Sequence, residues 1–281
     1  MSAVIAAVSV RDALDGARTA IGAAGSPSPV LDAELLLADA MGTTREWLRR
    51  EPDAPLTAGA TRAFRSAVIR RSRSREPVAY ILGRRGFRRL ELAVDPRVLI
   101  PRPETELLVE LALELPHGTA VLDCATGSGA IALALADERP DLSVTGSDLD
   151  EGALAVARAN AAGLALSVAW RQADLLEGLP DGYDAIVANV PYVAREAFRS
   201  LEPEVARHEP RLALDGGPGG LDVLEALIAQ AGTRGRVRTL ILEHGDEQAD
   251  AVAGACAAAG FAELELRSDL AGLPRAVRAR R

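Results

Sequence analysis

The chain contains few of the residues that build disulfide scaffolds or metal centres. Its 281 residues include two cysteines, Cys124 and Cys256, and three histidines. Two isolated cysteines cannot form a disulfide framework, so we expect both to be reduced, small and buried. The histidines are scattered without the spacing of metal ligands, and we expect no bound metal.

Long apolar runs are also missing. Hydrophobic residues make up 48% of the chain, but no run reaches the roughly 20 residues that a membrane-spanning helix needs. The charged pair Arg11-Asp12 follows the Ala/Val-rich start, and no basic stretch precedes it. We therefore expect no signal peptide, no membrane partner and a cytoplasmic location.

The charge balance argues against nucleic acid as the main partner. The formal net charge is −8, whereas proteins that follow nucleic-acid phosphates are usually basic, at least locally. Two basic runs occur, at residues 70–75 and 275–281. We interpret each as a solvated helix face or an edge strand, because Arg-rich edges discourage strand pairing.

The length and the change of character along the chain predict more than one domain. Residues 1–75 show helical periodicity and predict a small N-terminal helical bundle, with helices at 10–24, 30–41, 43–49 and 57–72. Residues 76–100 predict a linking β-hairpin that turns at Asp95-Pro96. Residues 101–281 form the third segment.

This third segment predicts an α/β fold. Pro101–Glu106 opens a helix that runs to Leu115, and Pro103 suits its first turn. Strands and helices then alternate, which is typical of a doubly wound parallel sheet. The expected strands lie near residues 119–124, 143–147, 167–171, 184–189, 237–243 and 261–267.

A small-residue loop between the first strand and its helix predicts a cofactor site. The loop holds Ala125, Thr126, Gly127, Ser128 and Gly129, and an apolar helix at 130–136 follows. The two glycines allow close backbone approach, and the opening helix turn offers free N–H groups. Such a strand–loop–helix edge usually holds a nucleotide-like cofactor.

The next strand ends in an acid that fits the same site. Asp148 follows the loop by about 20 residues, where a ribose hydroxyl pair would be held. A plainer interpretation makes Asp148 a solvated helix cap before Glu151. Asn189-Val-Pro-Tyr192 has no role in hydride transfer. The loop, the acid and this run together therefore favour S-adenosylmethionine (SAM) over a dinucleotide as the cofactor.

The run Asn189, Val190, Pro191 and Tyr192 follows a short apolar strand. Pro191 restricts the turn and biases Val190 toward extended geometry. The Asn189 carboxamide and the Val190 carbonyl should then present two acceptors beside an aromatic ring. This arrangement suits a planar group that bears an NH₂. An ordinary turn at the end of a strand would have the same sequence pattern.

Several motifs together resemble the HemK/PrmC family of release factor glutamine methyltransferases. The resemblance covers nearly the whole chain and rests on the motifs at 77–83, 99–106, 123–136, 189–192, 209–214 and 269–275. Pro101-Arg-Pro-Glu-Thr-Glu106 is the most specific of these. The resemblance implies a Rossmann-like SAM-dependent fold that methylates the side-chain nitrogen of a glutamine in the Gly-Gly-Gln loop of peptide chain release factors.

The resemblance also implies a role for each site residue. Residues 125–129 would hold the methionine part of SAM, Asp148 the ribose, Asp174 and Leu175 the adenine, and residues 189–192 the substrate amide. Asn189 would also reach the cofactor. The chain departs from the family pattern in three places: Ala125 replaces a usual Gly, Val190 a usual Pro, and Leu175 a frequent aromatic residue.

These departures leave the substrate more open than the cofactor. The alternatives are an amino-methyltransferase that acts on nucleic acid or on another amine or amide, and a SAM-binding protein without catalysis. We expect a monomer in which the N-terminal helices contact the protein substrate.

Overall fold

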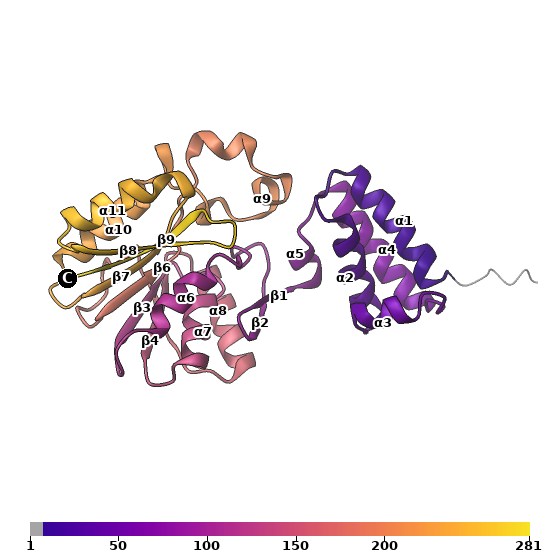
Figure 1. The fold of residues 1–281 in the computed structure, drawn as a ribbon. Helices are drawn as coiled ribbons and strands as arrows, with labels where there is room; N and C mark the ends of the chain where they lie inside the picture. Colours follow the sequence, from indigo (N-terminus) through magenta and orange to yellow (C-terminus); the bar gives the residue numbers. More distant parts are fainter. Residues whose placement is uncertain (1–7) are drawn as a thin grey trace, which may run out of the picture. The chain divides into compact units, whose positions relative to one another are not determined.

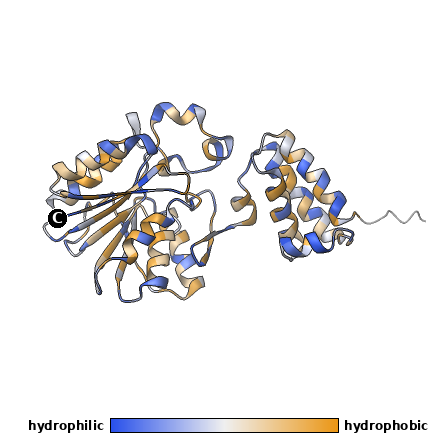
Figure 2. Cartoon of the chain, in the orientation of Figure 1, coloured by the Kyte–Doolittle hydropathy of each residue, from blue (hydrophilic) through white to orange (hydrophobic). Residues whose placement is uncertain are grey.

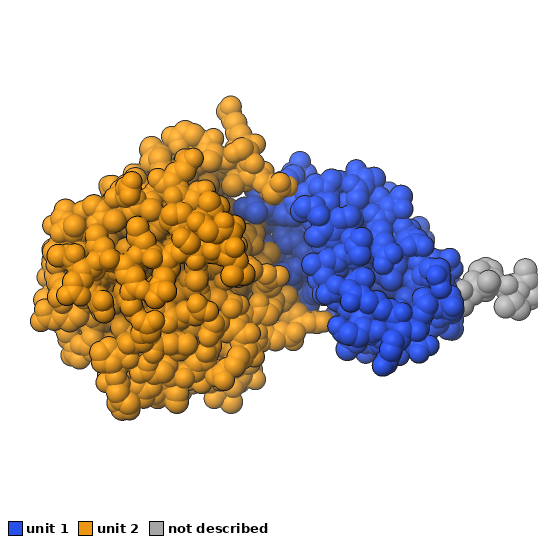
Figure 3. Space-filling model, viewed as in Figure 1, with its two compact units in different colours: residues 1–83, 203–208 blue, residues 84–202, 209–281 orange. Residues whose placement is uncertain are grey.

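The computed structural model describes residues 8–281, which form two compact units (Figure 3). Unit 1 contains the chain up to Gly83 together with the short segment Pro203–His208. Unit 2 contains Arg84–Glu202 and Glu209–Arg281. Residues 1–7, on which the expectation of no signal peptide partly rests, lie outside the described residues.

Unit 1 is a helical bundle, as predicted. Its helices are α1 (Val10–Ala23), α2 (Pro29–Met41), α3 (Arg45–Arg50), α4 (Ala58–Arg73) and α5 (Val78–Leu82), together with α9 (Pro203–His208). Side-chain oxygens cap three helix starts, at Ser9, Thr44 and Thr57, and each cap satisfies a backbone N–H that the helix leaves free. Leu36, Leu37 and Ile21 are among the apolar residues of its core.

The basic run at residues 70–75 is a solvated helix face only in part, because Arg70 and Arg73 are exposed while Arg71 and Arg75 are buried. Arg71 is buried and donates to Asp32, to Ser26 and to Glu204 of α9. Arg75 donates to the same Glu204 carboxylate from Nε and Nη2, at 2.8 and 2.7 Å. A buried charge is tolerated when it is paired and hydrogen-bonded, and this cluster holds α9 on unit 1.

The linking hairpin exists, but its predicted turn is wrong. Strands β1 (Arg84–Phe87) and β2 (Leu90–Ala93) pair antiparallel with Phe87 opposite Leu90, so the turn lies at Arg88-Arg89 rather than Asp95-Pro96. Arg88 takes a positive φ of 52° there. The segment before β1 is the helix α5, which ends at the left-handed Gly83.

The helix expected to open at Pro103 starts later. α6 spans Glu106–Leu113, and Thr105 is its N-cap residue. The preceding residues form successive tight turns, in which Thr105 N–H donates to Arg102 O and Glu106 N–H donates to Pro103 O. Pro103 therefore shapes the entry to α6 and not its first turn.

Unit 2 is built on a seven-stranded sheet with the order β5-β4-β3-β6-β7-β9-β8 (Figure 1). The first five strands in this order run parallel, and β9 runs antiparallel to both of its neighbours. The strands are β3 (Ala120–Cys124), β4 (Ser143–Asp148), β5 (Ala169–Gln172), β6 (Ala185–Ala188), β7 (Thr239–Glu243), β8 (Glu263–Ser268) and β9 (Pro274–Arg280).

The α/β prediction is confirmed, and the sheet is parallel except for β9, which the predicted strands did not include. The basic C-terminal run is neither a helix face nor an edge strand, because β9 lies between β7 and β8. Its arginines have acidic partners: Arg278 pairs with Glu265 and Glu114, and Arg275 with Asp269. These partners let a charged strand lie inside a sheet.

Helices cover both faces of the sheet and complete two apolar cores (Figures 1 and 2). On one face lie α6, α7 (Ala130–Glu138) and α8 (Glu151–Leu164); on the other lie α10 (Asp222–Thr233) and α11 (Ala249–Ala258). Short 3-10 helices occur at Arg195–Ser200, Arg211–Ala213, Pro218–Gly220 and Asp246–Gln248. None of the helices within residues 8–281 has both the length and the apolarity of a membrane span.

The strand order brings two chain segments together at one sheet edge. From β3 the chain proceeds outward to β4 and β5, then returns to β6 on the other side of β3. Cys124 and Ala188, the last residues of β3 and β6, are register partners. Ligands of open α/β sheets bind at such a switch point, so the loop after β3 and the turn after β6 form the candidate site.

Candidate active site

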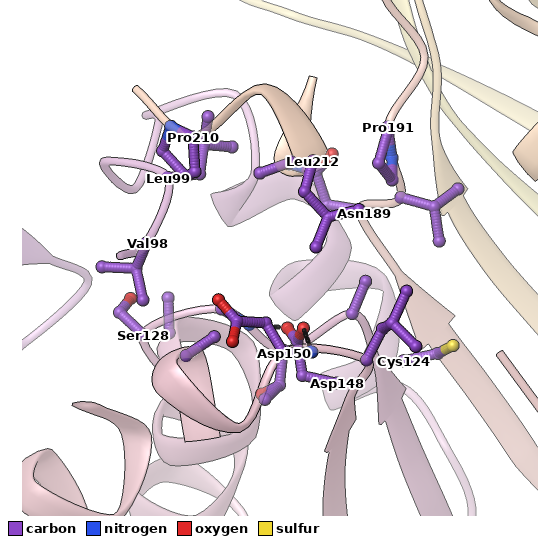
Figure 4. A pocket seen from close by; sticks show the side chains of 18 of the residues that line it. Val98, Leu99, Cys124, Ser128, Asp148, Asp150, Asn189, Pro191, Pro210 and Leu212 are labelled. Carbon is purple, nitrogen blue, oxygen red and sulfur yellow. Dashed lines mark hydrogen bonds between the residues drawn. The ribbon is translucent and has the colours of Figure 1, made fainter. Parts of the chain in front are cut away.

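A pocket of about 220 Å³ opens at this switch point (Figure 4). The carboxylates of Asp148 and Asp150 lie on one side of it, and Asn189 and Leu212 lie on the other. Most of the predicted site residues line it, namely Ala125, Thr126, Gly127, Ser128, Asp148, Asp174, Leu175, Asn189, Val190 and Pro191. The predicted residues Gly129 and Tyr192 are not among the described residues that line it.

The loop after β3 needs unusual backbone angles. Ala125, Gly127 and Gly129 have φ values of 58°, 57° and 84°, which glycine adopts freely and alanine does not. A Cβ at Gly129 would lie 3.1 Å from the Trp170 ring, so Gly129 allows close packing beneath the loop rather than contact with the cavity. The loop therefore has a fixed shape in which Ala125 is strained.

Asp123, at the penultimate position of β3, holds this loop from below. Its Oδ2 accepts hydrogen bonds from the Thr126 hydroxyl at 2.5 Å and from the Ala132 N–H at 3.0 Å. Oδ1 is buried and has no hydrogen-bond partner among the described residues. Burial raises the pKa of Asp123 to about 7, although the bonds from Thr126 and Ala132 oppose the shift.

Asp148 connects the end of β4 to the same loop. Its Oδ2 accepts the Gly127 N–H at 2.9 Å, and its Oδ1 accepts the Asp150 N–H at 3.0 Å. Burial raises the pKa of Asp148. The alternative role of helix cap belongs instead to Asp150, which accepts the Gly152 N–H at the start of α8.

The rest of the pocket wall is largely apolar. Leu149 and Leu212 line it and leave 46% and 55% of their surface exposed. Leu175 lines it beside them with a positive φ of 51°. Exposed apolar side chains that converge on one cavity are typical of a site for a flat, apolar ligand group.

Asn189 belongs to a chain of buried and partly buried hydrogen bonds at the sheet edge. Its Nδ2 donates to Thr105 Oγ1 at 3.0 Å, and the Thr105 hydroxyl donates to Glu243 Oε2 at 2.6 Å. The Tyr192 hydroxyl donates to Glu243 Oε1 at 2.9 Å. Tyr192 thus directs its polar end toward Glu243, and burial together with this carboxylate raises the pKa of the phenol.

Sequence reasoning missed the roles of Thr105 and Glu243. Thr105 lines the pocket, and Glu243 is the buried last residue of β7. It also missed the pair formed by Arg102 and Glu209, in which the arginine lines the pocket and donates to the buried carboxylate at 2.5 Å. A signal was available, because Thr105 lies in the most specific motif and an acid at the end of an apolar strand is unusual.

Two histidines lie outside the pocket, whereas one cysteine lines it. Neither His208 nor His244 is among the described residues that line the pocket, and the Nε2 atom of His208 contacts Ser74 O within unit 1. Cys124 lines the pocket and Cys256 lies in α11; both are free and buried, and burial raises the pKa of each thiol to about 12. Within residues 8–281, no cluster of three or more acidic, cysteine or histidine side chains is placed to hold a metal.

The lining of the pocket fits SAM. Backbone N–H groups and hydroxyls of the loop suit a methionine carboxylate, the carboxylates Asp148, Asp150 and Asp174 suit a ribose and a cationic ligand, and leucines suit a purine. The pocket lies at the switch point of a mostly parallel sheet, where ligands of open α/β sheets bind. Fold and site together therefore define a SAM-dependent methyltransferase.

Comparison with known proteins gives the family. A model described as the PrmC N-terminal domain matches residues 12–83, and one described as the methyltransferase small domain matches residues 103–210. The release factor glutamine methyltransferase of Geobacter sulfurreducens is 39% identical over 271 residues, which is 95% of each chain. The enzyme of that name from Caulobacter vibrioides is 41% identical and covers 90% of each chain. The chain belongs to the release factor glutamine methyltransferase family.

Among solved structures, a methyltransferase from Pyrococcus furiosus superposes with a TM-score of 0.51 at 16% identity, over 68% of this chain and 88% of that one. At this level of identity the likeness concerns the fold alone, and it agrees with the α/β sheet of unit 2.

Proposed function

We propose that this protein transfers the methyl group of SAM to the side-chain amide nitrogen of a glutamine in peptide chain release factors. In its most specific form, the proposal places this glutamine in the Gly-Gly-Gln loop. The observation that carries the proposal is the position of Asn189. It lines the cofactor pocket with its NH₂ group turned away, toward Thr105. Its carboxamide oxygen is then available to a substrate N–H.

Two acceptors at the pocket would orient the target amide. Asn189 Oδ1 would take one N–H and the Val190 carbonyl the other, since both residues line the pocket. Val190 is buried, and Pro191 follows it, so the carbonyl is held on a stiff segment. Val190 in place of the family's usual proline keeps this acceptor and loses one ring.

This arrangement addresses the main difficulty of the reaction. An amide nitrogen is a poor nucleophile because its lone pair is delocalised into the carbonyl. SAM supplies an electrophilic methyl group on a sulfonium. Holding both N–H groups would place the nitrogen in line with that methyl group, and orientation of this kind can lower a barrier by about 7–11 kcal/mol in the best cases. Acceptor dipoles would also favour positive charge as it develops on nitrogen.

The cofactor roles follow from the same pocket. The loop at residues 125–129 would hold the methionine part, and Asp148 would hold the ribose while it also fixes Gly127. Asp174 and Leu175 would border the adenine. Gly129 and Tyr192 would act indirectly, the former through packing beneath the loop and the latter through Glu243.

We further propose that unit 1 contacts the protein substrate. None of the residues that the structure describes in unit 1 lines the pocket. Family models match both parts of the chain, and the one for the N-terminal part covers residues 12–83. A separate helical unit without cofactor residues is suited to recognising a macromolecule.

A methyl-transfer assay tests the function. The protein is given SAM with a labelled methyl group and, in parallel, a release factor, the same release factor with its Gly-Gly-Gln glutamine replaced, RNA and DNA. We expect label in the intact release factor alone. Label in nucleic acid, or in the glutamine-replaced release factor, would contradict the proposal. Tight SAM binding without transfer to any of them would favour a non-catalytic role.

A further inference from the structure

We infer that Glu243 and Thr105 are positioning residues, which fix the side of the Asn189 carboxamide that faces the pocket. The inference rests on the proposed function, because it concerns the atom offered to the substrate amide. It is carried by three segments of unit 2 that meet at one point: the end of β7, the turn before α6 and the turn after β6.

Glu243 is the fixed end of this chain of hydrogen bonds. Its side chain is buried, with 1% of the residue exposed. Each carboxylate oxygen accepts from one hydroxyl: Oε2 from Thr105 at 2.6 Å and Oε1 from Tyr192 at 2.9 Å. Burial raises the pKa of Glu243, and the hydrogen bonds donated by Thr105 and Tyr192 oppose this rise because they favour the ionised form. An ionised carboxylate can only accept, so it sets the direction of both hydroxyls.

Thr105 passes this direction on to Asn189. A threonine hydroxyl has a single hydrogen, and here that hydrogen is directed at Glu243. Toward Asn189, Thr105 Oγ1 can therefore only accept. It accepts from Nδ2 at 3.0 Å, which places the NH₂ group on the Thr105 side and leaves Oδ1 for the pocket.

The direction matters because the two ends of a carboxamide have nearly the same shape. With its amide reversed, Asn189 would present two donors to a substrate that also presents donors. A reversed amide would also place an oxygen against the Thr105 oxygen, leaving buried groups unpaired. Such a mismatch is unfavourable because buried polar groups lose their partners, so the hydrogen bonds from Glu243 select the productive arrangement before substrate arrives.

Paired substitutions at Thr105 separate the hydrogen bond from packing. Thr105→Val keeps the shape and removes the hydroxyl, and Thr105→Ser keeps the hydroxyl. We expect Thr105→Val to lower the single-turnover rate at saturating SAM by about tenfold or more, and Thr105→Ser to stay within about threefold of the parent. SAM affinity should change by less than about threefold in both.

Glu243→Gln tests the other end. The glutamine NH₂ can donate to Thr105 Oγ1, which frees the threonine hydrogen to bond Asn189 Oδ1 and reverses the amide. We expect a loss of rate like that of Thr105→Val. Thr119→Val is the matched control: it also removes a buried threonine hydroxyl, one that donates to Pro116 O before β3 begins. That control should keep the parental rate.

A spectroscopic measurement reads Asn189 directly and does not depend on the substrate. The chain contains two asparagines, Asn160 and Asn189. Protein labelled with ¹⁵N at the asparagine side-chain amide therefore gives two NH₂ signals. Asn160, which donates to Ala93 O and Ser128 O, serves as the internal reference for an intact fold.

We expect the Asn189 signal to move in Thr105→Val and in Glu243→Gln while that of Asn160 stays in place. An unmoved Asn189 signal in both variants would overturn the inference. So would a moved signal with an unchanged rate, or equal losses of rate in the Val and Ser variants. If the parent fails to methylate any release factor, the proposed function fails, and the NMR comparison still decides whether Glu243 and Thr105 set the amide.

Discussion

The carboxylate of Asp148 accepts a hydrogen bond from the backbone N–H of Gly127, 2.9 Å away. One acid at the end of β4 thereby fixes the loop that follows β3, and the same acid lines the pocket. Its second oxygen accepts the Asp150 N–H at the entry to α8. We therefore propose that this side chain links the shape of the loop to cofactor binding.

Replacing Asp148 by Ala should weaken SAM binding by about 1.5–3 kcal/mol, because the ribose loses a charged acceptor and Gly127 loses its anchor. Titration calorimetry measures the change. Glu263→Gln, which removes a charge from the edge strand β8, is the control and should leave affinity unchanged. Equal affinity of the parent and the Asp148 variant would remove this residue from the site.

Replacing Ala125 by Gly should stabilise unit 2. Ala125 has a φ of 58°, a conformation that costs an L-residue about 1–2 kcal/mol and glycine little. The greater freedom of glycine in the unfolded chain offsets part of this gain, so we expect a net increase of about 0.5–1 kcal/mol in the free energy of unfolding. Ala155, which is exposed in helix α8, provides the control: Ala155→Gly should lower the free energy of unfolding by a similar amount.

Much of unit 2 follows from local sequence. Strands β3 and β6 are buried and largely apolar, and the residues with readable roles lie at or just after strand ends: Gly127 after β3, Asp148 at the end of β4 and Asn189 after β6. The hairpin turn was not readable, because Arg88-Arg89 lacks the usual turn residues while Asp95-Pro96 has them. The inner position of β9 was hidden as well, since its arginines resemble an edge until their partners Glu114 and Glu265 are known.

The candidate site, like the fold, could be predicted from the sequence only in part. The loop and Asn189 come from contiguous motifs. Thr105 and Glu243 are 138 residues apart and meet only because the end of β7 and the entry to α6 lie at the same sheet edge. Hydrogen bonds between distant segments leave no local pattern, so the residues that orient Asn189 needed the structure.

Stability of unit 2 should depend on pH through Asp123. Burial raises its folded pKa from 3.8 to about 7, so between these values the folded state holds a proton that the unfolded state has released. The stability this group contributes is present at low pH and is lost as pH rises through about 7. Asp123→Asn removes the titration, so the parent should lose stability relative to the variant as pH is raised.

Urea unfolding at about pH 5 and about pH 8 gives the comparison. The chain has two tryptophans, Trp47 in unit 1 and Trp170 in unit 2, so a Trp47→Phe background reports on unit 2 alone. A difference between parent and variant that stays constant with pH would contradict the raised pKa of Asp123.

The buried cluster around Arg71 should stabilise unit 1 without affecting cofactor binding. Arg71→Met leaves the buried Asp32 and the partly buried Glu204 each with one partner fewer, which we expect to cost about 3 kcal/mol of unfolding free energy. Arg11→Met breaks an exposed pair with Asp53 and should cost under about 1 kcal/mol. Trp47 fluorescence in a Trp170→Phe background follows the unfolding of unit 1. Calorimetry on Arg71→Met with Trp170 intact should find SAM affinity unchanged. A weakened affinity would mean that the cluster also shapes the pocket.

The most direct test of the account is single-turnover methyl transfer to a release factor at saturating SAM, with the parent and Asn189→Ala compared. Alanine removes the carboxamide oxygen and leaves one substrate N–H unpaired. We predict a loss of at least about 2 kcal/mol in the transition state, roughly 30-fold in rate, with SAM affinity much less affected. A variant rate within about threefold of the parent would show that Asn189 only ends its strand, and the proposed placement of the glutamine amide would be wrong.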